Sequence, residues 1–261
     1  MTAMPGPEAR RVPARHRWIP RQHGAWAMLL LPVLLGIAAS RPSPWHLALA
    51  GTALAAYLAS ASLQAWFRAG RPPAYRAPIL AYGAVFAGLG LLLAMAFPVL
   101  LLTLAVIVPT AVIVLGGARP GTRRDLANSL AQVVQALALV PASAVVSGAF
   151  EPERVLAYTL VAAGYLFGTV LVVRSVLRER GNEQLAMLSV AFHLALVAIA
   201  AVTIPLPYAA LAAGLTARAV ALPMLQRRRA PGSRPMRPIQ VGIVEIVAST
   251  AVAVVSFLAP I

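Results

Sequence analysis

Four polar residues recur on one face of an apolar helix near the middle of the chain. Asp125, Asn128, Gln132 and Gln135 follow one another at steps of three, four and three residues, a spacing that aligns their side chains along a helix. An amide that faces lipid has no adequate hydrogen-bond partner, so this face must turn toward other helices. It either forms interhelical hydrogen bonds or lines a polar cavity, and the sequence leaves both interpretations open.

Arginines stand at a similar depth on two other apolar segments. Gln64 and Arg68 are one turn apart near the end of one segment, and Arg174 and Arg178 are one turn apart near the end of another. Guanidinium groups bind phosphate and carboxylate directly, without a metal ion. Arginines at such positions also anchor helices at the cytosolic face of a membrane. The spacing alone does not decide between the two roles.

Further candidates for ligand binding surround these pairs. Glu179, Gly181 and Asn182 follow Arg178, and Gly181 is a typical helix C-terminus. A second group precedes or begins the first apolar segment and includes a tryptophan typical of the membrane interface; its members are Arg21, Gln22, His23 and Trp26. His193 lies within an apolar segment, one turn from Ser189, and we expect it to face the interior.

Two charged residues are buried in consecutive apolar segments. Arg218 and Glu245 each lie about six residues from the end that carries the basic loops. Because consecutive helices run antiparallel, both charges reach the same depth, and we expect them to form a structural ion pair.

The composition requires a membrane. Hydrophobic residues make up 60% of the 261-residue chain and charged residues 11%, whereas soluble domains average about 45–50% apolar and about 25% charged residues. There is no cysteine, which excludes disulfides and thiolate chemistry. With seven acidic residues and a single aspartate, Asp125, we expect neither a metal site nor a cofactor.

Apolar segments bounded by Arg, Pro and Gly predict an all-α, polytopic bundle of about nine transmembrane helices. We expect residues 1–22 to form a disordered, basic cytosolic tail and 23–261 a single transmembrane domain. Two pairs of neighbouring helices are expected to be joined by tight turns, one around Phe97-Pro98 and one around Ile204 to Pro207. The expected spans are 24–40, 45–67, 77–96, 98–117, 126–147, 155–177, 185–203, 206–224 and 239–259.

All 22 basic residues are arginine, and they predict the orientation. With the N-terminus in the cytosol, 19 of them fall in the tail and in alternate, inward-facing connections, as the positive-inside rule requires. We therefore expect a multi-pass protein of the bacterial inner membrane with its C-terminus outside the cytosol. The net charge of +15 follows from this distribution and does not indicate nucleic-acid binding.

The segment from Pro20 to Leu29, with the sequence PRQHGAWAML, resembles the opening signature of the YwiC-like family of bacterial membrane proteins. Two further segments are similar to that family: Asp125 to Asn128 after an Arg-rich loop, and Phe167 to Asn182 followed by His193. The resemblance extends over most of residues 18–200.

A more distant resemblance is to the UbiA prenyltransferase superfamily. It implies nine helices, a cytosolic N-terminus and a central cavity bordered by the loops after the second and sixth helices, here 68–76 and 174–184. The superfamily holds magnesium and a prenyl diphosphate with aspartate-rich motifs, and hard cations need several oxygen ligands. Loop 68–76 contains no acid, and loop 174–184 offers Glu179 and Glu183 among three arginines. A magnesium–diphosphate site of that kind is not expected.

These observations leave three hypotheses. The first is a UbiA-like scaffold whose Arg-lined, cytosol-facing cavity binds membrane lipids, in particular an anionic amphiphile or isoprenoid. If this scaffold is an enzyme, we expect a divergent UbiA-like transferase. Its candidate general bases are then His23, Glu179 and Asp125. The second is a small-solute transporter, although no matched pair of Gly- or Pro-broken helices is evident. The third is a non-catalytic accessory protein of the membrane.

Overall fold

The protein is described here by a computed structural model that covers residues 18–19, 25–118, 126–228 and 235–261, and every regular element in these ranges is helical. Eight helical segments of 19 to 27 residues are long and apolar enough to cross a bilayer, since about 20 residues span the hydrocarbon core. The expected polytopic helical bundle is confirmed. The elements are α2 (Ala25–Ala38), α3 (Trp45–Arg68), η1 (Pro73–Tyr75), α4 (Arg76–Ala96), η2 (Pro98–Thr103), α5 (Leu104–Gly116), α6 (Leu126–Leu137), α7 (Leu139–Ser147), α8 (Pro152–Val173), the π-helical turn η3 (Arg174–Arg178), α9 (Glu183–Thr203), α10 (Leu206–Arg227) and α11 (Pro238–Leu258).

The first expected span, 24–40, corresponds to α2. Its 14 residues are fewer than a bilayer requires, and residues 20–24 before it lie outside the described part of the chain. The ninth crossing therefore stays a prediction. The expected span 126–147 is present but consists of two helices, α6 and α7. Pro141 lacks the N–H that would bond the carbonyl of Leu137, which explains the break between them.

Proline and glycine end the helices at the expected places. Phe97 separates α4 from η2, and Ile204 and Pro205 separate α9 from α10, so both predicted tight turns are confirmed. Gly181 has a φ of +84° in the turn between η3 and α9, a left-handed conformation that glycine adopts without a steric penalty. Its predicted position at a helix end is also confirmed.

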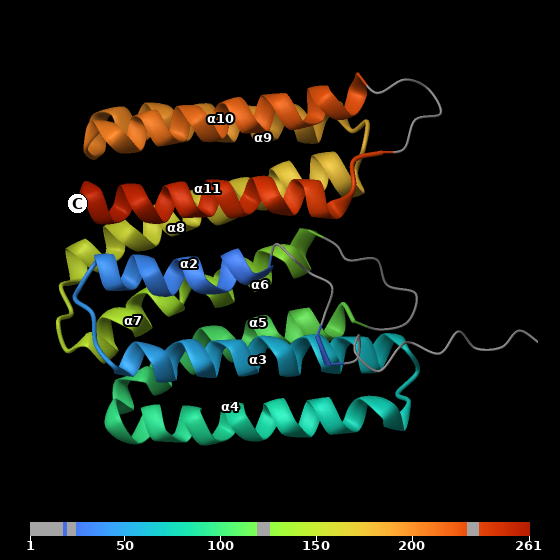
Figure 1. The fold of residues 1–261 in the computed structure, drawn as a ribbon, viewed down its shortest axis with the longest axis vertical. Helices are drawn as coiled ribbons and strands as arrows, with labels where there is room; N and C mark the ends of the chain where they lie inside the picture. Colours follow the sequence, from blue (N-terminus) through green and yellow to red (C-terminus); the bar gives the residue numbers. More distant parts are fainter. Residues whose placement is uncertain (1–17, 20–24, 119–125, 229–234) are drawn as a thin grey trace, which may run out of the picture.

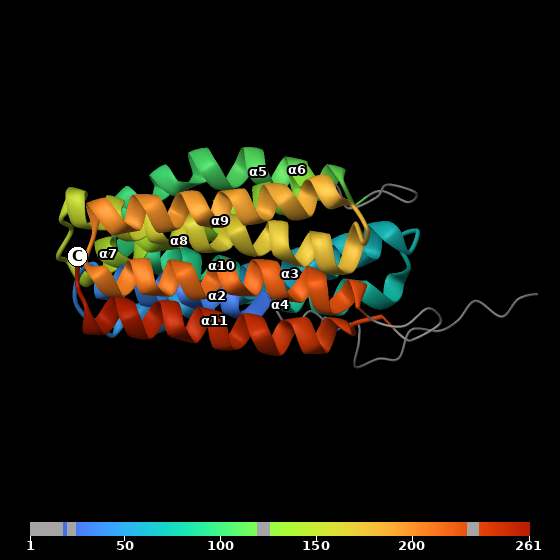
Figure 2. The ribbon, with the colours of Figure 1, turned by 90° about the horizontal axis from the view of Figure 1, so that it is seen from above.

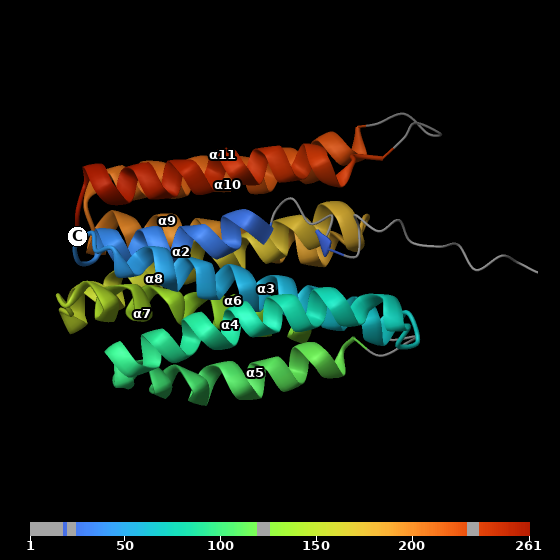
Figure 3. The same ribbon diagram turned by 60° about the horizontal axis from the view of Figure 1, so that its bottom comes forward.

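The helices run nearly parallel to one another, with α10 on one flank of the bundle and α4 on the opposite flank (Figures 1 and 3). Residue 261 lies at one end, together with the α2–α3, α4–α5, α7–α8 and α9–α10 connections (Figures 1 and 2). The α3–α4 and α8–α9 connections lie at the other end, where α10 finishes and α11 begins.

We call this second end the Arg-rich end. Of the arginines in the described loops and helix ends, Arg41 and Arg154 belong to the end that holds residue 261. Those of the Arg-rich end are Arg68, Arg71, Arg76, Arg174, Arg178, Arg180, Arg227, Arg228 and Arg237. The sequence places the arginines in alternate connections, and in the structure these connections lie at the same end of the bundle.

The main apolar core surrounds α8. Leu31 and Leu35 of α2, Leu166 of α8 and Val252 of α11 are buried in one cluster. By contrast, α4 and α5 bury few of their own residues. In a bilayer their apolar outer faces meet lipid, which needs no protein partner.

Candidate functional site

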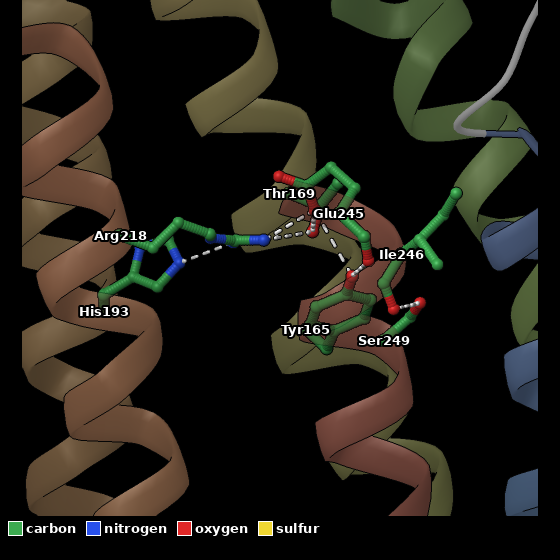
Figure 4. A network of polar contacts seen from close by, with 7 residues as sticks. All are labelled: Tyr165, Thr169, His193, Arg218, Glu245, Ile246 and Ser249. Carbon is green, nitrogen blue, oxygen red and sulfur yellow. Dashed lines mark hydrogen bonds and ion pairs between the residues drawn. The ribbon is translucent and has the colours of Figure 1, made fainter. Parts of the chain in front are cut away.

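Four neighbouring helices bring five polar side chains together inside the bundle (Figure 4). We call this group the interior network; it consists of Tyr165 and Thr169 from α8, His193 from α9, Arg218 from α10 and Glu245 from α11. The ion pair expected between Arg218 and Glu245 is present, with Nη1 2.5 Å from Oε2 and both side chains less than 10% exposed. Charges at this depth are costly unless they are paired.

One carboxylate oxygen of Glu245 accepts all the hydrogen bonds that this side chain makes. Thr169 Oγ1 donates to Oε2 at 3.1 Å, in addition to the bond from Arg218. The Tyr165 hydroxyl shares its one proton between the Glu245 backbone carbonyl at 3.1 Å and Oε2 at 3.3 Å. Tyr165 and Thr169 are one turn apart on α8, so the helix presents both donors to α11.

The other side of Arg218 faces His193. The His193 Nδ1 lies 2.7 Å from the Ser189 carbonyl, and because a carbonyl only accepts, Nδ1 carries the proton. Nε2 of the neutral ring then has a lone pair and accepts from Arg218 Nη2 at 3.5 Å. Arg218 therefore lies between two bases, an imidazole and a carboxylate, as Figure 4 shows.

A glycine allows α9 to come this close to α8. A Cβ at Gly168 would lie 2.8 Å from His193 Nε2 and 3.3 Å from the Phe192 ring, closer than carbon atoms approach without displacement. Gly168 is thus required by the position of the imidazole and not by its own backbone conformation.

Three polar atoms in this region are buried and have no hydrogen-bond partner among the described residues: Glu245 Oε1, Arg218 Nε and Ser189 Oγ. A buried polar atom without a partner costs about 1–3 kcal/mol. A buried water molecule or a ligand bonded to these atoms would remove that cost.

A second polar group, which we call the end cluster, lies at the Arg-rich end. It consists of Gln64 and Arg68 of α3, Ser129 of α6, Arg174 and Arg178 of η3, and Glu179 and Asn182 of the turn that follows. Arg68 of α3 donates to Gln64 at 2.9 Å, and Arg178 of η3 donates to Ser129 of α6 at 3.4 Å. Arg68 and Arg178 are close enough for their charges to repel each other. Two arginines that are 110 positions apart in the chain thus lie at one end of the bundle, within range of each other's charge.

Glu179 organises the turn after η3. Its Oε1 accepts from Arg174 Nε at 2.9 Å and from Arg174 Nη2 at 2.5 Å, and its Oε2 accepts from Asn182 Nδ2 at 3.1 Å. Asn182 also caps α9, because its Oδ1 accepts from the Leu185 N–H at 3.0 Å. These candidate ligand residues therefore hold the turn in shape as well.

The amides of α6 bond partly to each other and to α5. Asn128 is buried and donates to the Val114 carbonyl at 3.2 Å, while Gln132 donates to Asn128 at 2.9 Å. Asn128 thus forms an interhelical hydrogen bond, which is one of the two interpretations that the sequence left open. Gln132 is half-buried and lies one turn from it.

The remaining candidates cannot be placed in either group. Arg21, Gln22, His23 and Asp125 lie outside the described residues, as does nearly all of the expected tail, 1–22. Trp26 belongs to the first turn of α2, but its side chain is likewise outside the described part.

Sequence reasoning missed Tyr165 and Thr169 as partners of Glu245. Their signal was available, since Tyr158, Tyr165 and Thr169 follow at steps of seven and four on one face of α8. It also missed His46, which is buried and bonds the Ser143 carbonyl through Nε2 at 3.0 Å, joining α3 to α7.

A cavity of about 760 Å³ lies at the end opposite the Arg-rich end and is lined by residues 150–154, Ala157 and Ile261. An apolar cavity of about 220 Å³ lies among α3, α4, α5 and α7. Within the ranges that the structure covers, no three His, Asp or Glu residues cluster closely enough to hold a metal ion.

The helices and the buried charges define a polytopic α-helical membrane protein. Residues 19–144, from before α2 into α7, match the family model described as YwiC-like protein. The chain is 32% identical over 180 residues to the protein named uncharacterized protein YwiC of Bacillus subtilis (strain 168), covering 68% of this chain and 74% of that protein. The chain belongs to the YwiC-like family. The interior network lies beyond the residues that the family model matches.

No solved structure matches the chain. The likeness to the UbiA arrangement therefore stays a prediction from the sequence.

Proposed function

We propose that this protein binds the anionic headgroup of a membrane amphiphile, a phospholipid or an isoprenoid, at the end cluster. The observation that carries the proposal is the placement of Arg68 of α3 and Arg178 of η3 at the same end of the bundle, each bonded to a neutral side chain and within range of the other's charge. An anion placed between two guanidinium groups removes the repulsion between them and gains charge-assisted hydrogen bonds.

The charge count around this pair supports an anionic ligand. Arg174 is neutralised by Glu179, and among the described residues Arg68 forms no ion pair. Arg68 therefore leaves the cluster with a positive charge. The neutral donors Gln64 and Gln132 can complete the contacts to a phosphate.

The proposal is tested by native mass spectrometry of the delipidated protein after incubation with phosphatidylglycerol or phosphatidylcholine. We expect wild type to retain phosphatidylglycerol. The double variant Arg68→Gln/Arg178→Gln should bind it about 10- to 100-fold more weakly, because glutamine keeps a neutral donor and loses only the charge assistance of each hydrogen bond. The matched control is Arg228→Gln/Arg237→Gln, which removes equal charge at the same end. Equal losses in both double variants would mean that the arginines act only through net charge.

We also propose that the Arg-rich end faces the cytosol of a bacterial inner membrane, with Ile261 outside. The distribution of arginines between the two ends supports this orientation. A C-terminal alkaline phosphatase fusion should be active and a C-terminal green fluorescent protein fusion dark. The reverse pair of results would contradict both the orientation and the odd number of crossings.

A second candidate function is transport of a small solute. It is favoured by the interior network, because ionisable residues within a membrane mark ion or substrate pathways more often than they serve packing. Reconstituted vesicles distinguish the two functions: a binding protein of the lipid headgroup leaves solute gradients intact, whereas a transporter dissipates the gradient of its solute.

A further inference from the structure

We propose that Glu245 is a reversible proton-binding site in the interior of the bundle, with the added proton on Oε1. This inference goes beyond the proposed function and does not depend on it, because the interior network and the end cluster share no residue. The ligand is a proton, accompanied by water at the unpartnered atoms of the network.

The contacts of Arg218 differ from those of a bidentate arginine–carboxylate pair. An arginine that only neutralises a carboxylate does so best with two parallel bonds, one to each oxygen. Here Arg218 uses Nη1 for Glu245 Oε2 and turns Nη2 toward His193. The Arg218 guanidinium is thus shared by two bases. Glu245 Oε1 has no hydrogen-bond partner among the described residues.

A proton fits on Oε1 without breaking any bond that the structure contains. Arg218 and Thr169 donate to Oε2, and the single hydroxyl proton of Tyr165 is shared between Oε2 and the Glu245 backbone carbonyl. Oε1 is buried and has no partner among the described residues. Once protonated it becomes a donor, and a buried water molecule, which commonly bonds such atoms, can accept from it.

The alternative acceptor in the network is less suitable. A proton on His193 Nε2 would occupy the lone pair that accepts from Arg218 and would set two cations face to face. The proton on Nδ1 is already held by the Ser189 carbonyl at 2.7 Å. The added proton therefore binds to Glu245 and not to the imidazole of His193.

Among the residues that the structure describes, the groups that face Glu245 from the packed helices include no second acid. Helix α8 contributes Tyr165 and Thr169, α10 contributes Arg218, and α9 contributes His193 behind it. The sequence of α2, which also packs on α11, has no titratable residue. Proton uptake consequently changes the network from neutral to a single positive charge within the membrane.

The test is infrared difference spectroscopy on the whole protein in phosphatidylcholine nanodiscs while the pH is lowered from about 8 to about 5, a range that brackets most perturbed carboxyl groups. We expect the C=O stretch of a protonated, buried carboxylic acid to grow in wild type and to be absent in Glu245→Gln. Glu183→Gln, which removes an exposed carboxyl group, is the matched control and should retain the band.

A second variant keeps the test decisive if Glu245→Gln does not fold. Thr169→Val preserves shape but removes a donor to the carboxylate, so at a fixed pH the protonated fraction should be about fivefold larger while that fraction is small, the equivalent of one hydrogen bond. Absence of the band in both wild type and Thr169→Val would overturn the proposal. A band that persists unchanged in folded Glu245→Gln would do the same.

Discussion

The interior network and the end cluster use the same two residue types, arginine and glutamate, in different surroundings. In the interior, the Arg218 and Glu245 side chains are 7% and 4% exposed, whereas for Arg174 and Glu179 at the membrane end the values are 11% and 34%. A third pair, Arg227 with Glu183, is 49% and 71% exposed at 3.1 Å. The three pairs form a series of increasing solvent exposure, with N–O distances of 2.5, 2.5 and 3.1 Å. We expect burial, more than contact distance, to set the coupling energy of each pair.

The largest effect is expected from breaking the interior pair. Arg218→Leu or Glu245→Leu alone should reduce the free energy of unfolding by about 3–5 kcal/mol, because each strands a buried charge. The double variant should lose less than either single variant. Unfolding by titration with dodecyl sulfate in mixed micelles measures all four proteins. Losses in the single variants that simply add in the double variant would contradict coupling between the two charges.

Gly168→Ala tests the close approach on which the network depends. Its Cβ would lie 2.8 Å from His193 Nε2. We expect a loss of about 1–2 kcal/mol, since overpacking costs about 1–3 kcal/mol and is partly offset by the helix preference of alanine.

The matched control for Gly168 is Gly83→Ala in α4, where nothing lies within 4 Å of the added carbon. It should be neutral or slightly stabilising in the same assay. Equal destabilisation by both substitutions would show that helix α9 is not held in place by contact with Gly168.

The intermediate pair should give an intermediate result. A double-mutant cycle with Arg174→Met and Glu179→Gln should yield a coupling energy of about 1–1.5 kcal/mol, typical of charged hydrogen bonds with partial solvent access. A value as large as that of the interior pair would show that the lipid headgroup region screens less than the exposed fractions suggest.

The smallest effect is expected at Arg227 and Glu183. The cycle with Arg227→Met and Glu183→Gln should give a coupling energy below about 0.5 kcal/mol, and it should fall further at high salt. A salt-independent coupling at this pair would contradict the view that solvent exposure sets the order of the series.

Much of the fold could be predicted because the bilayer restricts the possibilities. Apolar segments bounded by Pro98, Gly181 and Pro205 gave the correct helix ends, since these residues punctuate a helix whatever surrounds it. The break between α6 and α7, before Pro141, was missed. Hydropathy indicates whether a segment crosses the membrane, but it does not indicate whether the segment is one continuous helix.

The candidate sites could be predicted only in part, for a related reason. Arg218 and Glu245 were expected to pair because depth in the membrane follows from position in a helix. Which faces of α8 and α11 meet depends on how each helix rotates about its axis, and packing decides this. The sequence therefore places Tyr165 and Thr169 on one face of α8 but does not identify Glu245 as their partner. Asp125 and His23 lie outside the described residues and stay candidates on sequence grounds.

The location of Glu245 on α11 also imposes an order on biosynthesis. As the chain emerges, α10 brings Arg218 into the membrane before its counter-ion on α11 exists, and an unpaired arginine disfavours insertion by about 2.5–3.5 kcal/mol. Thr169 and His193 are already synthesised and offer neutral partners in the interval. By contrast, α4 and α5 contain no charged residue beyond Arg76 at the first position of α4 and can enter lipid without waiting for later helices. The last hairpin therefore becomes committed to the membrane as a unit, when α11 supplies the missing negative charge.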